Sequence, residues 1–321
     1  MDEQPERLLM QPRILLVTSA LYCGAIVAAA LWLGAKASDF LWVLPSLLST
    51  AIFMGVIFAL AAVIVYIREI IRNRSIGKDT SARVNAIYNE SMTAARLLPM
   101  LPFLVVATLV FLGLSIGKSL IVHTVGYSAD PMLANFDKAL HSGYYPHDLI
   151  ASVIETWNLV PLLNFCYYFW FGILMLSVWC AAFLKQDEVV RMRFWWSLQI
   201  IILLLGGLLA FALPSVGPIY YADFYTAGAQ PYEEYLTHLR NIDETVIRLQ
   251  SFQVSDILLA LSRDESIVDL NGISAMPSLH VALAFLFFLY LRQFGRWIGA
   301  FAFLFFMFIF IGSVYFAWHY A

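Results

Sequence analysis

The chain contains 321 residues, of which 61% are hydrophobic and 13% are charged, and its mean hydropathy is +0.78. This composition excludes an ordinary soluble globular protein and predicts an integral membrane protein. The formal net charge of −3 gives no sign of nucleic-acid binding. The three cysteines, Cys23, Cys166 and Cys180, lie within apolar runs and indicate neither a disulfide framework nor a zinc site.

Apolar segments recur along the chain at lengths suited to bilayer-spanning helices, which need about twenty apolar residues. The first run is too long for a signal-peptide core, and Asp2, Glu3 and Glu6 precede it, so we interpret it as a retained anchor. The fold class expected is therefore an all-α polytopic membrane helical bundle of about seven transmembrane helices. The predicted crossings lie near residues 14–35, 41–66, 98–121, 160–184, 195–213, 278–294 and 297–318, the sixth being the shortest.

Lysines and arginines predict the orientation, because the cytoplasmic loops of membrane proteins are enriched in them. With a cytoplasmic N-terminus, most of them fall on the cytoplasmic side and all six histidines fall on the outer side. Any histidine chemistry is then expected to be extracytoplasmic. Residues 1–97 are interpreted as an N-terminal helical hairpin and a basic cytoplasmic loop. The basic cluster from Arg68 to Lys78 is either an orientation signal at an anionic leaflet or a lipid-binding site.

The outer segment 123–158 carries helix signals. Asp130 and Pro131 pair an N-cap residue with a first-turn proline, which predicts a helix running to about Leu140. Gly143 then breaks the pattern, and Pro146 predicts the start of another helix. Within the first of these helices, Asp137 touches either a substrate hydroxyl or a helix end.

The fifth crossing ends at Pro214, since prolines terminate helices. The following residues, 222–274, form the longest outer loop, and a second short helix is predicted there from about Ser255. A loop of this length is either a lid over a lipid head-group site or a segment packed on the bilayer surface. Its first part carries one apolar helix face, made of Tyr235, Leu239, Ile242, Val246 and Leu249.

The stretch from Gly272 to His280 opens directly into the sixth crossing. Pro277 predicts helix position one or the residue just before it, with Ser278 and His280 in the first turn. Free amides and the helix dipole at such an end attract an anion, usually phosphate. A hydroxyl and an imidazole add a hydrogen-bond donor and a titratable group. The alternative is an ordinary capped membrane helix with a histidine at the membrane interface.

A second histidine, His319, follows one membrane crossing later, in Trp318-His319-Tyr320. Pro-Ser-Leu-His at the head of a membrane helix, followed after one crossing by His-Tyr, resembles the type-2 phosphatidic acid phosphatase superfamily. The closer resemblance is to its inositol phosphorylceramide synthase-like branch, because Leu279 stands where the phosphatases have glycine. The resemblance covers roughly residues 120–321. It divides the chain into the N-terminal part, 1–97, and a phosphatase- or phosphotransferase-like membrane domain, 98–321, with outer loops 123–158 and 214–277.

The resemblance implies a role for each motif residue. His319 would be the nucleophile that forms a phosphohistidine, and His280 would be the general acid. No metal or cofactor is implied. The phosphatases' third motif has an arginine where Ser313 stands, so the phosphate charge would be met by Arg240, Arg248, Arg263 or Lys118. The further candidates are Ser278, Leu279, Ser313 and Arg263 as phosphate-binding residues, and Pro214, Pro218, Tyr220 and Tyr315 as a possible wall of the site.

The expected function is a membrane lipid phosphotransferase that moves a phospho-head group between sphingolipids or phospholipids at the outer leaflet. A lipid phosphate phosphatase, of phosphatidic acid or polyprenyl phosphate type, is the alternative, and the two differ in whether an alcohol or water attacks the phosphohistidine. A non-enzymatic lipid-binding or transport protein is disfavoured, because the crossings lack ionisable residues near mid-membrane. The branch pattern would put an orienting aspartate at position 323. The sequence therefore predicts a longer native chain with an eighth crossing.

Overall fold

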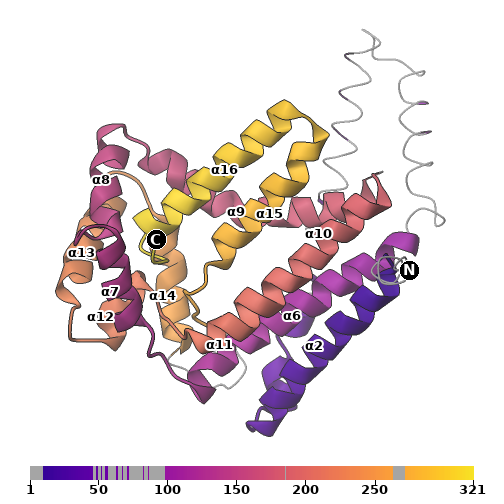
Figure 1. Cartoon of the computed structure of the whole chain (residues 1–321), viewed down its shortest axis with the longest axis horizontal. Coiled ribbons are helices and arrows are strands. Elements are labelled where there is room, and N and C mark those ends of the chain that lie inside the picture. The colour runs from indigo at the N-terminus through magenta and orange to yellow at the C-terminus, as the bar shows by residue number, and fades with distance from the viewer. Residues whose placement is uncertain are drawn as a thin grey trace, which may run out of the picture.

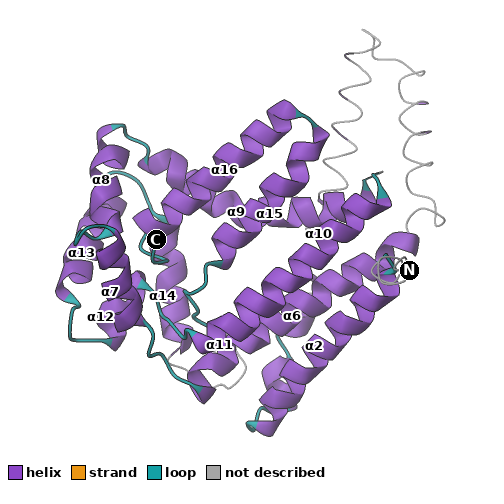
Figure 2. Ribbon diagram, viewed as in Figure 1, coloured by secondary structure: helices purple, strands orange, loops and turns teal. Residues whose placement is uncertain are grey.

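The computed structural model describes residues 10–45, 98–184, 186–262 and 272–321, together with scattered residues between 48 and 86. Within these residues every regular element is a helix and no strand occurs (Figure 2). The prediction of an all-α polytopic helical bundle is confirmed. The second predicted crossing and the basic cluster from Arg68 to Lys78 lie mostly outside the described residues.

Among the described residues, five helical segments are long and apolar enough to cross a membrane. The shorter apolar helix α15 (Leu279–Leu291), extended by a 3-10 turn to Phe294, precedes the last of them. These helices coincide with the remaining six predicted crossings and make the chain an integral membrane protein. The long segments are α2 (Pro12–Trp32), Leu98–Thr124 with α6 (Leu101–Thr124), α9 (Val160–Phe183), Glu188–Ala212 and α16 (Arg296–Tyr315). The fourth contains α10 (Glu188–Ile201), the π-helix η3 (Ile202–Leu209) and α11 (Ala210–Ala212).

The sequence marks the start of half of these helices, and of several others, with proline. A proline in the first turn lacks an amide hydrogen that would have no partner there, so it begins a helix without losing a hydrogen bond. This applies to α2, α6 and α9 in the bundle, and to α7 (Asp130–Leu140), α8 (Pro146–Thr156) and α13 (Gln230–Thr245) outside it. The helices predicted from Pro131 and Pro146 are therefore present with nearly the expected bounds.

The helices α7, α8, α12 (Tyr221–Phe224), α13 and α14 (Gln250–Ser262) gather at one end of the bundle, and we call them the cap (Figure 1). The predicted apolar stripe on α13 faces inward, since Tyr235, Leu239 and Ile242 are buried, whereas Val246 follows the helix end and is exposed. The cap packs on the adjacent ends of α9 and α16 through Leu163, Tyr315 and Phe316.

Two pairs of packed helices in the bundle hold the site in place. The helix α2 lies along α6, and α15 lies beside α16, to which it is joined by a turn at Gly295 (Figure 1). The helix α9 packs against both α15 and α16. Consequently the start of α15 and the end of α16 are neighbours at the cap end of the bundle, where the chain's C-terminus also lies.

Candidate functional site

Three loops meet between the cap and the bundle. They follow α11 (213–217), precede α15 (272–278) and follow α16 (316–321). The Ala275 amide donates to the Ser215 carbonyl at 2.9 Å, and the Ile219 amide donates to the Ala317 carbonyl at 2.7 Å. Gly217 lies so close to the other two loops that a Cβ there would be 2.6 Å from the Trp318 carbonyl oxygen. The loops therefore form one layer, although they are distant in sequence.

The carboxylate of Asp130 holds this layer in place. Asp130 is fully buried at the start of α7, and its side chain does not cap that helix as predicted, because the N-cap position belongs to Ala129. Its oxygens instead accept hydrogen bonds from two of the loops and from the cap. The donors are Ser215 Oγ at 2.7 Å, Val216 N at 3.0 Å, Gly217 N at 2.9 Å, Tyr320 Oη at 3.0 Å and, in the cap, Tyr225 Oη at 3.2 Å. Five donors from distant parts of the described chain therefore meet at one buried carboxylate.

The layer brings the two motif histidines together. His319 Nε2 lies 3.5 Å from His280 Nδ1, and the ring centroids are 5.6 Å apart. The other nitrogen of His319, Nδ1, is hydrogen-bonded to the Ala275 carbonyl oxygen. Because a carbonyl only accepts, Nδ1 carries the proton and Nε2 presents its lone pair toward His280. A backbone carbonyl thus fixes the tautomer of His319.

The protonation state of His319 follows from its surroundings. The side chain is only 5% exposed. Burial lowers the pKa of His319 to about 4; the bond to the Ala275 carbonyl raises it, and the positive charge of Lys118 lowers it further. The imidazole is therefore neutral near pH 7, which is the form that can act as a nucleophile.

His280 lies in the first turn of α15. Ser278 is the N-cap residue and its Oγ accepts a hydrogen bond from Val281 N at 3.3 Å, so Pro277 lies just before the helix. The His280 ring lies against two aromatic rings of α9, those of Trp170 at 4.3 Å and Tyr167 at 5.4 Å between centroids. Trp170 Nε1 also donates to the His280 carbonyl oxygen at 3.1 Å. The α9 aromatic residues thus fix the position of His280.

The other predicted phosphate-binding residues lie around this pair in different ways. Leu279 is buried against η3, where Gly206 leaves room for its side chain. Ser313 Oγ donates to the Phe310 carbonyl oxygen within α16 at 2.7 Å. Arg263 lies outside the described residues. Arg240 and Arg248 are paired with carboxylates of the cap, at 3.4 Å and 3.1 Å respectively.

The predicted wall residues contribute to the loop layer or to the cap. The Pro214 carbonyl oxygen accepts from the Ser128 and Ala129 amides, which ties the loop after α11 to the start of α7. Pro218 begins a 3-10 turn. The hydroxyl of Tyr220 donates to the Ser255 carbonyl oxygen, and that of Tyr315 donates to Glu155 Oε1, both at 3.1 Å. The two tyrosine hydroxyls therefore bind the cap and do not face the histidines.

The side chain of Asp137 contacts the end of the segment that follows α16 and, among the described residues, caps no helix end. Its carboxylate accepts the Ala321 backbone amide, with both oxygens at 3.2 Å. Burial raises the pKa of Asp137, while the bond to Ala321 and the neighbouring His141 lower it. Together with Asp130, it fastens the segment that carries His319 to α7.

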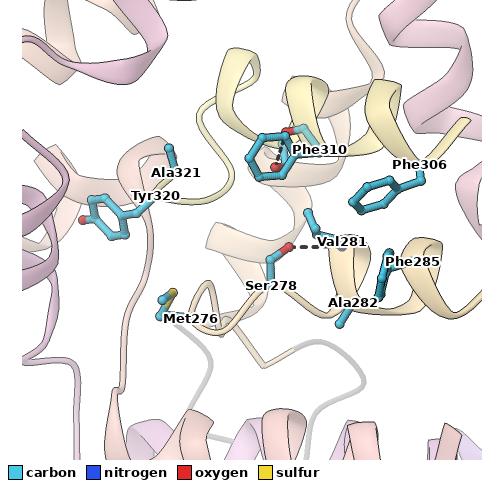
Figure 3. A pocket seen from close by; sticks show the side chains of 10 residues that line it. Met276, Ser278, Val281, Ala282, Phe285, Phe306, Phe310, Tyr320 and Ala321 are labelled. Carbon is cyan, nitrogen blue, oxygen red and sulfur yellow. Dashed lines mark hydrogen bonds between the residues drawn. The ribbon is translucent and has the colours of Figure 1, made fainter. Parts of the chain in front are cut away.

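A cavity of about 440 Å³ begins beside the histidine pair and runs between α15 and α16. In Figure 3, Ser278 lies between Met276 and Tyr320 on one side and the rings of Phe285 and Phe306 on the other. The two imidazoles do not line it; His280 faces α9. The lining consists of Met276, Ser278, Val281, Ala282, Phe285, Phe306, Phe310, Ser313, Tyr320 and Ala321.

The fold and the site define an integral membrane protein in which two buried histidines are paired at one end of a helical bundle. A family model described as the PAP2 superfamily matches residues 131–321, and the chain belongs to this superfamily. The chain is accordingly a phosphoryl-transfer enzyme of the lipid phosphatase and phosphotransferase type. Comparisons with curated proteins and with solved structures gave no match. The superfamily inferred from the sequence is confirmed, and its finer branch is not distinguished.

Proposed function

We propose that the protein is a lipid phosphotransferase that moves a phospho-head group from one lipid to another at the outer leaflet, through a phosphohistidine on His319. The observation that carries the proposal is the histidine pair, with His319 Nε2 3.5 Å from His280 Nδ1 and with its tautomer fixed by Ala275. The outer-leaflet assignment is supported by the predicted distribution of lysine and arginine.

The two chemical steps use the two imidazoles in turn. In the first, His319 Nε2 attacks the phosphorus, the bond to the leaving lipid alkoxide breaks, and His280 gives that alkoxide its proton. In the second, His280 takes the proton of an acceptor hydroxyl, whose oxygen attacks the phosphorus and releases His319. The neutral state of His319 and the short separation from His280 support both steps.

The apolar cavity supports a lipid substrate. Phe285, Phe306 and Phe310 line its length, whereas Ser278 and Tyr320, each within two residues of a histidine in sequence, line its other end. A lipid chain between α15 and α16 would place its phosphate beside the start of α15.

Transfer is preferred to hydrolysis because Leu279 and Ser313 replace the glycine and arginine of the phosphatases, as the synthase-like branch does. Purified protein incubated with phosphate-labelled phospholipid, with and without a lipid alcohol acceptor, separates the two reactions. We expect label in a new phospholipid that depends on the acceptor. Label released only as inorganic phosphate, at a rate unaffected by the acceptor, would establish hydrolysis instead.

Two histidine variants test the roles of the pair. His319→Ala should abolish the acid-labile phosphoenzyme, because the attacking nitrogen is gone. His280→Ala should slow phosphoenzyme formation with lipid alkoxide leaving groups by about 10²–10⁴-fold and spare substrates with good leaving groups, which need little protonation. His123→Ala, at the exposed end of α6, is the control. Normal phosphoenzyme formation in His319→Ala would show that another residue is the nucleophile.

A further inference from the structure

The hydroxyl of Tyr167 is a buried polar group with no partner next to His280. The Tyr167 ring is nearly parallel to the His280 imidazole, at 15° and 5.4 Å between centroids, and it meets the Phe316 ring edge-on at 5.7 Å. A Cβ at Gly312 would lie 3.1 Å from Tyr167 Cδ2, so α16 also confines the ring. Within the described part of the chain, Tyr167 Oη is buried and makes no hydrogen bond.

A buried hydroxyl without a partner costs free energy, because it has lost its hydrogen bonds to water and gained none. Phenylalanine at the same place would make the same ring contacts without this cost. Tyr168, the next residue on α9, is 57% exposed and is therefore not a buried tyrosine of this kind. The unpaired hydroxyl of Tyr167 therefore fits a group that receives its partner only when a ligand is bound.

Lys118 brings a positive charge to the same place from α6. Leu114, one turn earlier on α6, and Leu279 of α15 meet at Gly206, where a Cβ would be 2.6 Å and 3.0 Å from their Cδ1 atoms. One turn beyond this contact, the backbone of Lys118 touches Gly272 in the loop before α15. The ion pairs found among the described residues do not include Lys118. Its charge nevertheless acts on His319.

Phosphoryl transfer requires such groups, because negative charge develops on the equatorial oxygens of the phosphoryl group. The hydroxyl of Ser313, at the place of the phosphatases' arginine, is occupied within α16. Arg240 and Arg248 are paired in the cap. We propose that Tyr167 Oη and Lys118 Nζ bind the non-bridging oxygens of the substrate phosphate, the tyrosine as a hydrogen-bond donor and the lysine as the counter-charge. This inference rests on the proposed phosphoryl-transfer function.

The test compares Tyr167→Phe with Tyr168→Phe, since each removes one hydroxyl from the same turn of α9. Two quantities are measured in detergent: kcat/KM for labelled phospholipid, and the inhibition or direct binding constant of inorganic phosphate. Loss of a hydrogen bond to a charged group should weaken both by about 10- to 100-fold in Tyr167→Phe. Tyr168→Phe should stay within about twofold of the wild type, as surface changes do.

Thermal unfolding distinguishes substrate binding from a structural role. Because the Tyr167 hydroxyl has no partner, Tyr167→Phe should unfold at the wild-type temperature or above it. Lys118→Met should lose phosphate binding, and Lys118→Arg should recover part of it, because only the arginine keeps the charge. Wild-type phosphate binding and turnover in Tyr167→Phe would overturn the proposal, and so would an absence of phosphate binding by the wild type. Phosphate binding that depends on Tyr167 without any turnover of phospholipid would instead refute the proposed function and leave this inference standing.

Discussion

Replacing Asp130 by asparagine should loosen the layer of loops that carries the histidine pair. The substitution keeps the shape of the side chain and turns one acceptor oxygen into a donor. Oδ1 accepts three hydrogen bonds and Oδ2 accepts two, from Val216 N and Tyr225 Oη. Hydroxyls can accept as well as donate, so the bond that must be lost is that of a backbone amide. In either orientation of the new side-chain amide, Val216 N or Gly217 N is left facing another donor.

The structure gives the size of this effect. A buried donor that loses its acceptor costs about 1–3 kcal/mol, so Asp130→Asn should destabilise the protein by about that amount. The catalytic effect is expected to exceed the loss of folded protein, since displacing a reacting group by about 1 Å can cost roughly 10²-fold in rate. Tyr320, which directly follows His319, also donates to Asp130, so a shift of this side chain reaches the histidine pair.

Thermal unfolding in detergent and phosphoenzyme formation by the folded fraction measure the two effects separately. Asp256→Asn is the control: its carboxylate belongs to an exposed pair with Arg240, and such pairs contribute about 0–1 kcal/mol. Wild-type unfolding temperature and activity in Asp130→Asn would refute the reasoning, because five hydrogen bonds to one buried carboxylate would then have no measurable consequence.

Two further predictions concern acid pH. Burial lowers the pKa of both His147 and His319 from 6.5 to about 4. Between pH 4 and pH 6.5 the unfolded chain therefore binds protons that the folded chain does not bind. The unfolding temperature should therefore fall as the pH is lowered from 6.5 toward 4, and His147→Phe should remove part of this fall. An unchanged pH dependence would contradict the assignment. The acid limb of kcat/KM, which reports deprotonation of His319 in the free enzyme, should lie near pH 4, and a limb at 6.5 would show that another group controls it.

Much of the fold could be predicted because its signals are local. Apolar run lengths give the crossings, and first-turn prolines such as Pro131 and Pro146 give the starts of the cap helices. The proximity of His280 and His319 also follows from local features, since two crossings joined by a short turn at Gly295 must be neighbours. In these cases the interactions that decide the structure lie within one or two helices.

The roles of Asp130 and Tyr167 could not be predicted, because they depend on interactions between parts of the chain that are far apart in sequence. The donors to Asp130 lie in loops 85 to 190 residues further along the chain, and the path of those loops depends on the assembled bundle. The helix α9 is apolar on all sides, so its sequence does not show that Tyr167 and Trp170 face His280. The sequence offers Lys118 as one of several candidate cations, and only the tertiary structure distinguishes it from Arg240 and Arg248, which are paired in the cap.

The close contact at Gly217 gives the last prediction. Gly217 has φ +83° and ψ 167°, and Gly295, in the turn between α15 and α16, has φ +137° and ψ 158°. Both lie in a region of backbone conformation that is essentially restricted to glycine, so alanine should cost each about 1–3 kcal/mol of strain. A Cβ at Gly295 would meet nothing within 4 Å, whereas one at Gly217 would be 2.6 Å from the Trp318 carbonyl oxygen and 2.7 Å from Ala275 Cβ.

Ala275 and Trp318 are the residues that hold the nucleophile: one accepts the His319 Nδ1 hydrogen bond and the other precedes His319 in the chain. Gly217→Ala must push them apart, and His319 then loses the bond that keeps Nε2 unprotonated. Both alanine variants should therefore unfold at a lower temperature, but only Gly217→Ala should also lose phosphoenzyme formation in its folded fraction, by roughly 10²-fold or more. Equal activity per folded molecule in the two variants would show that backbone strain alone explains the effect, and that the Ala275 carbonyl does not set the tautomer of His319.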